Sequence, residues 1–158
     1  MCEHCGCRGV EPIAELMDEH YALLDEAHQV RAALASGDRR TALDRLRVLV
    51  GHLGRHVHRE EDGVFAALRD RGEYLDEVEQ LEKEHVLLDD GIARLDPDDP
   101  LLDRAVEALF RELEEHIERE NLGVFPVSVV TLGARGWDTV EQARRTYPTF
   151  LEGNSHAR

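Results

Sequence analysis

The chain has 158 residues, of which 42% are hydrophobic and 34% charged, and this predicts a soluble globular protein of one domain with a full core. Lysine and arginine number 19 against 34 aspartate and glutamate residues, giving a formal net charge of −15. We therefore expect neither nucleic acid nor a membrane surface as a partner. The sequence shows no run of about 18 apolar residues and no signal peptide pattern, which predicts a cytoplasmic protein.

Three cysteines, Cys2, Cys5 and Cys7, lie within the first seven residues and cannot staple a fold of this size. Their spacing is compatible with a soft metal or with dithiol–disulfide exchange. A closed zinc site needs four ligands, and His4 is awkwardly placed to supply the fourth. A reduced, unstructured tail is the alternative. We treat residues 1–11 as a separate N-terminal segment.

Apolar residues recur at helical spacing along most of the remaining chain. The predicted helices cover residues 12–36, 39–72, 74–95 and 102–131, with a short fifth helix at 137–147. Pro12 suits a first helical turn, Asp38 is an expected N-cap, and Gly72 is an expected stop. Pro126 should kink or loosen the fourth helix.

Short loops between long amphipathic helices make neighbouring helices antiparallel. The sequence therefore predicts an all-α, up-down-up-down four-helix bundle over residues 12–131, followed by a short helix and tail over 132–158. Sites in such bundles lie between facing helices. The first and third helices run in one direction and the second and fourth in the other, so two similar halves can be related by an approximate twofold axis.

Two halves of the chain carry the same patterns. His-x-x-x-Glu-x-x-Gly-Val-Phe occurs at residues 56–65 and 116–125, and Glu-His-x-x-Leu occurs at 19–23 and 84–88. Positions i and i+4 lie about 40° apart on a helix, so each His and Glu pair projects from one face. Imidazole suits iron, zinc, copper and nickel, while a carboxylate can span two hard ions.

A dinuclear metal site is the hypothesis that this duplication favours. Its candidate ligands are His20, His56, Glu60, His85, His116 and Glu120. Two buried carboxylates without partners would each cost several kcal/mol, and the inward stripes of the second and fourth helices show no basic residue. Bound cations are the simplest compensation. For any one of these histidines, a satisfied core residue is the alternative.

The six residues, in this order and duplicated, resemble the hemerythrin-like (HHE cation-binding) domains over roughly residues 12–130. The segments Glu61-Asp62-Gly63-Val64-Phe65 and 121–126 belong to the resemblance, which extends more loosely to the cysteine-rich opening and the Gly136-Trp137 region of actinobacterial members. It implies a non-haem centre of two iron ions, with the four histidines as ligands and the two glutamates as bridges.

One departure from the oxygen-carrying hemerythrins is informative, because those have a second histidine where this chain has Asp89. Asp89 could ligate weakly, accept a hydrogen bond from a ligand imidazole, or face solvent. His52, one turn before His56, could be an accessory ligand, a proton relay, a pocket-lining group or a polar residue closing the bundle. Tyr21 and Tyr74 could approach a metal, although packing is favoured.

The rival ferritin-like architecture needs two Glu-x-x-His pairs, and only Glu82 with His85 has that spacing. Glu82 could still be a partner of a ligand histidine or an exposed helix residue.

The resemblance implies a protein that reacts with a small oxidant: hydrogen peroxide, dioxygen or nitric oxide. A peroxide- or nitric-oxide-detoxifying activity is our leading interpretation, and peroxide consumption is the narrower one. An iron or oxygen sensor, or a reversible oxygen-binding protein without turnover, is the alternative. A structural bundle with incidental histidines is a third class and predicts no stoichiometric metal. Iron against manganese or zinc, and whether the protein forms a homodimer, stay open at this level.

Overall fold

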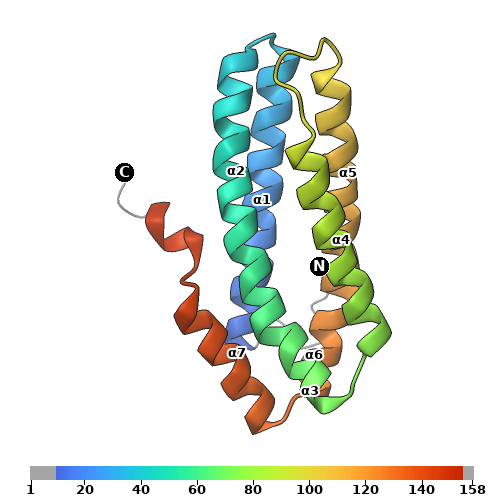
Figure 1. Cartoon of the computed structure of the whole chain (residues 1–158). Coiled ribbons are helices and arrows are strands. Elements are labelled where there is room, and N and C mark those ends of the chain that lie inside the picture. The colour runs from blue at the N-terminus through green and yellow to red at the C-terminus, as the bar shows by residue number, and fades with distance from the viewer. Residues whose placement is uncertain (1–9, 155–158) are drawn as a thin grey trace.

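The computed structural model describes residues 10–154, and within that range every regular element is helical. The four long helices are α1 (Glu11–Ala35), α2 (Arg39–Glu60), α4 (Leu75–Ala93) and α5 (Leu102–Arg119). The shorter elements are η2 (Glu61–Phe65), α3 (Ala66–Arg71), η3 (Glu120–Val124), α6 (Phe125–Thr131), α7 (Ala134–Thr146) and η4 (Phe150–Asn154). The predicted all-α bundle is confirmed (Figure 1). Over residues 10–154, no helix has the length and apolar content that a membrane crossing requires.

The helix ends follow the local chemistry of the sequence. The side chain of Asp38 accepts a hydrogen bond from the backbone N–H of Thr41 at 3.1 Å and so caps the start of α2. Gly72 ends α3 in the left-handed region at φ 73°, a conformation that glycine adopts without a steric penalty. Pro12 occupies the first turn of α1, where its missing N–H costs nothing.

The bundle consists of four helical rods: α1, α2 with η2 and α3, α4, and α5 with η3 and α6. The two π-helical segments η2 and η3 interrupt the second and fourth rods, and the sequence patterns did not predict them. Elements η2 and η3 begin at or directly after Glu60 and Glu120, the carboxylates of the two repeats. Pro126 lies in the first turn of α6, directly after η3. The departure from regular α-helix that was expected at this proline therefore lies mainly before it. Such π-helical turns often occur at functional sites, because they redirect the side chains around them.

The core consists of two apolar clusters separated along the bundle axis. One cluster includes Leu16 and Phe125, and the other includes Leu23 and Leu113. On α1, His20 lies between Leu16 and Leu23, and the ligand candidates on the other three rods fall at the same junction. The fold therefore places one polar layer between two dry layers, where water cannot screen its charges.

Helix α7 packs against η2, α3 and the end of α2, beside the lower half of the bundle in Figure 1. Gly63 makes this approach close, because a Cβ atom added there would lie 3.3 Å from the Cβ of Ala143. The ring of Tyr147 stacks on His58 with centroids 5.2 Å apart. The predicted short helix is therefore present, but it begins at Ala134, three residues earlier than expected.

Candidate metal centre

Four rods of the bundle bring all six candidate ligands into one buried layer. His20 comes from α1, His56 and Glu60 from α2, His85 from α4, His116 from α5 and Glu120 from η3. Their donor atoms form two groups, each with atoms within 4.8 Å of one another. The first group is His20, His56, Glu60 and Glu120, and the second is Glu60, His85, His116 and Glu120. The groups share both carboxylates, so the arrangement offers two adjacent sets of donor atoms, each of which could hold a metal ion.

Each imidazole uses its Nδ1 atom to donate a hydrogen bond to an oxygen on a neighbouring rod. The pairs are His20 with Asn121 at 2.8 Å, His56 with Glu19 at 2.7 Å, His85 with Glu61 at 2.8 Å and His116 with Glu84 at 3.3 Å. A hydrogen bond donated by Nδ1 fixes the orientation of the ring, so that Nε2 is the nitrogen atom that could bind a metal. All four Nε2 atoms consequently face the two shared carboxylates.

These supporting contacts repeat with the same twofold relation as the candidate ligands. Glu19 and Glu84 precede the lone histidines of the two halves, and each accepts from the histidine of the adjacent His-x-x-x-Glu pair. Glu61 and Asn121 directly follow the paired glutamates, and each accepts from a lone histidine. Glu82, for which the sequence left open a partner role or an exposed helix position, pairs with Arg69 and not with a candidate ligand.

The expectation that the inward face of the second helix lacks a basic residue is wrong, because Arg59 is buried there. Its guanidinium donates to Glu19 and Glu15, both on α1, and does not contact the carboxylate of Glu60. Arg119 is its equivalent in the second repeat and donates to Glu84 through Nε at 2.9 Å and Nη2 at 2.8 Å. The two arginines thus neutralise Glu19 and Glu84, the carboxylates that accept hydrogen bonds from the paired histidines. Other positive charges must therefore balance Glu60 and Glu120.

Two phenylalanines orient the lone imidazoles. The ring of His20 stacks on Phe125 with centroids 5.4 Å apart and an interplanar angle of 13°, and His85 stacks on Phe65 at 5.7 Å and 11°. These rings close the Gly-Val-Phe part of each repeat, directly after or within the π-helical turns. Phe125 of the second repeat therefore limits rotation of His20 in the first half, and Phe65 of the first repeat limits rotation of His85 in the second half.

Several buried polar atoms in this layer have no hydrogen-bond partner, and their chemical type indicates whether a metal ion would fit between them. Nε2 of His56, Oε2 of Glu60 and both carboxylate oxygens of Glu120 are buried without a hydrogen bond. The Nε2 atom of His56 is only 2.7 Å from Oε1 of Glu60, but this contact is not aligned as a hydrogen bond. Imidazole nitrogens and carboxylate oxygens are the donor set of non-haem iron. The residues therefore fit a bound cation.

Protonated imidazoles balance the carboxylates when the layer holds protons. Burial alone lowers the pKa of His20, but the nearby carboxylates of Glu120 and Glu60 outweigh it and raise that pKa to about 10. Burial also lowers the pKa of His85, but the carboxylates of Glu60 and Glu61 outweigh it and raise that pKa to about 10.

The two shared carboxylates stay ionised for the converse reason. Burial raises the pKa of Glu60, yet the charge of His56 and hydrogen bonds from the histidines hold it well below its usual value. For Glu120, burial and the charge of Glu60 raise the pKa, and His116 outweighs both. The proton and the metal therefore compete for the same nitrogen atoms.

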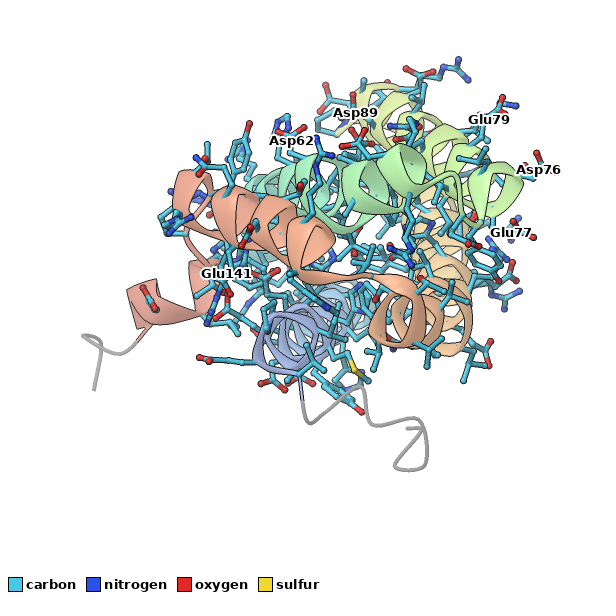
Figure 2. The ribbon with its side chains drawn as sticks, turned by 90° about the horizontal axis from the view of Figure 1, so that it is seen from below. Asp62, Asp76, Glu77, Glu79, Asp89 and Glu141 are labelled. Atoms are coloured by element: carbon cyan, nitrogen blue, oxygen red, sulfur yellow. The ribbon has the colours of Figure 1, made fainter. Side chains whose placement is uncertain are left out.

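Of the accessory candidates, Asp89 and His52 belong to neither donor group. Asp89 is exposed on the outer side of α4 (Figure 2). His52 donates from Nδ1 to Glu26 at 2.6 Å and stacks on Phe150, above the ligand layer. Tyr74 adopts φ 58° before α4, and its hydroxyl lies 3.2 Å from where a Cβ of the residue at position 123 would be. The Cys2, Cys5 and Cys7 cluster falls outside the described residues.

In the comparison with protein families, the chain matches the hemerythrin HHE cation binding domain over residues 11–128. Because this match spans most of the chain, the protein belongs to the hemerythrin HHE cation-binding family, whose members bind metal ions, usually iron. The resemblance inferred from the motifs is thus confirmed. Neither the curated proteins nor the solved structures gave a match.

Sequence reasoning missed the residues that support the candidate ligands. Glu19 and Glu84 were part of the repeated Glu-His pattern but were given no role, and the arginines at 59 and 119 occupy equivalent positions in the two halves. A comparison of the two repeats position by position would have found all four. That signal indicates equal roles, but not burial or partners.

Proposed function

We propose that this chain holds two iron ions in the buried layer and reacts with a small neutral oxidant. His20 and His56 serve one ion, His85 and His116 serve the other, and Glu60 and Glu120 are shared. The observation that supports this proposal is the pair of four-residue donor groups with both carboxylates in common. Two histidines and carboxylate oxygens per ion resemble the donor set of iron proteins that keep open coordination positions for an oxidant.

When bound, the iron pair supplies electrons and Lewis acidity to the oxidant. The chain's own groups define where this happens. Hydrogen bonds at Nδ1 hold each imidazole with Nε2 inward, and the phenylalanine stacks restrict the ring planes. The apolar clusters above and below exclude water, so charges in the layer interact strongly.

Peroxide disproportionation is the narrower proposal. One hydrogen peroxide molecule gives up two electrons and two protons and becomes dioxygen, while a second accepts them and becomes two waters. This balance needs no external reductant. The formal charge of −15 does not repel a neutral oxidant, and Asp89, which replaces a ligand histidine of the oxygen carriers, lies outside both donor groups.

Metal analysis with the visible spectrum of aerobically purified protein tests the centre. We expect about two iron ions per chain, and Glu60→Ala should lose most of them. A Cys2/Cys5/Cys7 triple serine variant should keep the metal and serves as the control. Full metal content in Glu60→Ala would show that the ligand assignment is wrong.

Stopped-flow spectroscopy of the anaerobically reduced protein then separates turnover from carriage. Rapid oxidation with catalytic loss of peroxide supports the proposal, whereas a long-lived oxygenated band supports a reversible oxygen-binding protein.

A sensor is the second candidate, and two contacts favour it. The hydroxyl of Thr149 donates to Oε1 of Glu19 at 2.7 Å, and Glu19 in turn accepts from His56. Arg144 of α7 also pairs with Glu15, a partner of Arg59. The C-terminal elements therefore contact the supporting network of one half-site. Hydrogen exchange of residues 134–152 should change on metal removal if occupancy is read out here, and an unchanged pattern argues against a sensor.

A further inference from the structure

A hollow of about 250 Å³ opens between α2 and α4 and is lined in part by His85, one of the candidate ligands. Most of its wall is apolar, including Val57 and Val86, and its polar side chains are those of His58, Glu61, His85 and Asp89. His85 is one of the candidate ligands, and Glu61 accepts the hydrogen bond from its Nδ1. The hollow therefore extends from the surface of the bundle to the imidazole of one candidate ligand and to the carboxylate that supports it.

Gly54 lines the hollow and contributes no side chain to it. A Cβ atom built at this position meets no other atom within 4 Å, so the missing side chain leaves real space. In the second repeat, 60 positions later, the equivalent residue is Glu114, which bonds Arg31 at 2.8 Å. The chain thus has an open position on the α2 side and a large, ion-paired side chain at the matching place on α5.

The residue equivalent to Asp89 in the other half also differs in the way it covers the bundle. His85 corresponds to His20, so Asp89 corresponds to Leu24 on α1. Leu24 packs against the apolar core, whereas Asp89 is exposed and lines the hollow. Gly54 in place of a glutamate and Asp89 in place of a leucine therefore break the twofold relation of the repeats. Both residues line the hollow, so the face between α2 and α4 stays open.

The walls indicate what kind of molecule enters. Apolar cavity walls bind small apolar molecules such as xenon, and most of the wall of this hollow is apolar. Two carboxylates, Glu61 and Asp89, disfavour anions at the polar end. The favoured occupant is therefore a small neutral molecule.

We propose that the hollow between α2 and α4 is the entrance through which small neutral molecules reach the His85 side of the centre, and that Gly54 keeps it open. The proposal rests on the proposed function for the fate of the molecule, but not for its entry. It assigns a role in access to a residue that is no candidate ligand.

The chain offers a matched pair of variants. Gly51 lies one turn before Gly54 on the exposed side of α2 and also has no atom within 4 Å of an added Cβ, but it does not line the hollow. Phenylalanine at either position replaces a glycine inside a helix, so both variants should fold at least as well as the parent protein. Gly54→Phe fills the hollow, and Gly51→Phe is the control.

The first measurement is xenon binding to the metal-free protein, followed by NMR of valine methyl groups. We expect xenon to shift the methyl resonances of Val57 and Val86 in the parent protein and in Gly51→Phe, and not in Gly54→Phe. Unshifted Val57 and Val86 methyl groups in the parent protein would overturn the proposal, as would unchanged shifts in Gly54→Phe. This measurement requires neither metal nor turnover.

The second measurement is the rate at which dioxygen oxidises the reduced, iron-loaded protein. Gly54→Phe should be slower by about tenfold, which corresponds to 1.36 kcal/mol of added barrier, while Gly51→Phe should match the parent. Equal rates in all three proteins would refute the entrance. If the parent protein binds no iron or does not react, the proposed function fails, and the xenon result still decides whether the hollow admits small neutral molecules.

Discussion

Arg59 and Arg119 occupy equivalent positions in the two repeats, so replacing each with methionine compares one interaction in two environments. The side chain of Arg59 is 3% exposed and its partner Glu19 is 0% exposed, whereas the side chain of Arg119 is 50% exposed beside Glu84 at 11%. Methionine keeps most of the apolar stem and removes the charge. The difference between the variants therefore reports on the buried charge.

Removing one partner of a buried ion pair typically costs about 3–5 kcal/mol, because the remaining charge stays desolvated. An exposed pair contributes about 0.2–1 kcal/mol. We expect Arg59→Met to lower the free energy of unfolding by about 3 kcal/mol, since Glu19 keeps hydrogen bonds from His56 and Thr149. Arg119→Met should lower it by about 1 kcal/mol.

Urea unfolding of the metal-free proteins in excess chelator measures both values without a contribution from metal binding. A double variant, Arg59→Met with Glu19→Gln, should recover part of the loss, because no uncompensated carboxylate then remains buried. Equal losses in the two single variants, or a larger loss at Arg119, would refute the reasoning from burial.

Three further predictions follow from the polar network. Burial raises the pKa of Glu15, but hydrogen bonds from two arginines hold it below its usual value, so the folded state favours the ionised form. The stability difference between the parent protein and Glu15→Gln should be full above about pH 4.3 and vanish as the pH falls through the lower folded-state pKa, as urea unfolding at a series of pH values can show. Metal loading at pH 7 should release roughly two protons, detectable with a pH indicator in weak buffer, because His20 and His85 both have a pKa raised to about 10 in the metal-free protein; no release would contradict the competition between proton and metal. Thr149→Val should weaken iron affinity about tenfold in a chelator competition, since Glu19 loses a donor, while the exposed control Thr146→Val should not change it.

The sequence was sufficient for the features that depend on local chemistry. Apolar periodicity predicted the four rods, Asp38 and Gly72 predicted helix ends, and the duplicated His and Glu pattern predicted six residues that the structure brings into one layer. These features follow from hydrogen bonding and side-chain direction within one or two helical turns, so a linear pattern contains them. Their role as ligands stays a prediction.

The sequence patterns failed where packing decides. The inward stripe of the second helix was expected to contain no basic residue, yet Arg59 is buried there because Glu19 and Glu15 on α1 pair with it. The two π-helical turns were also missed, since the pattern of apolar residues does not distinguish them from an α-helix. Both features depend on contacts between helices that are distant in sequence.

The repeat in the sequence determined that two alike half-sites would exist and which residue types they would contain. Only the tertiary structure decided how the halves differ. Helix α7 and Thr149 reach the network behind His56, while Gly54 leaves the face near His85 open. A duplicated motif specifies equal local geometry, but what covers each half depends on which remote segments pack against it, and the two halves have different neighbours.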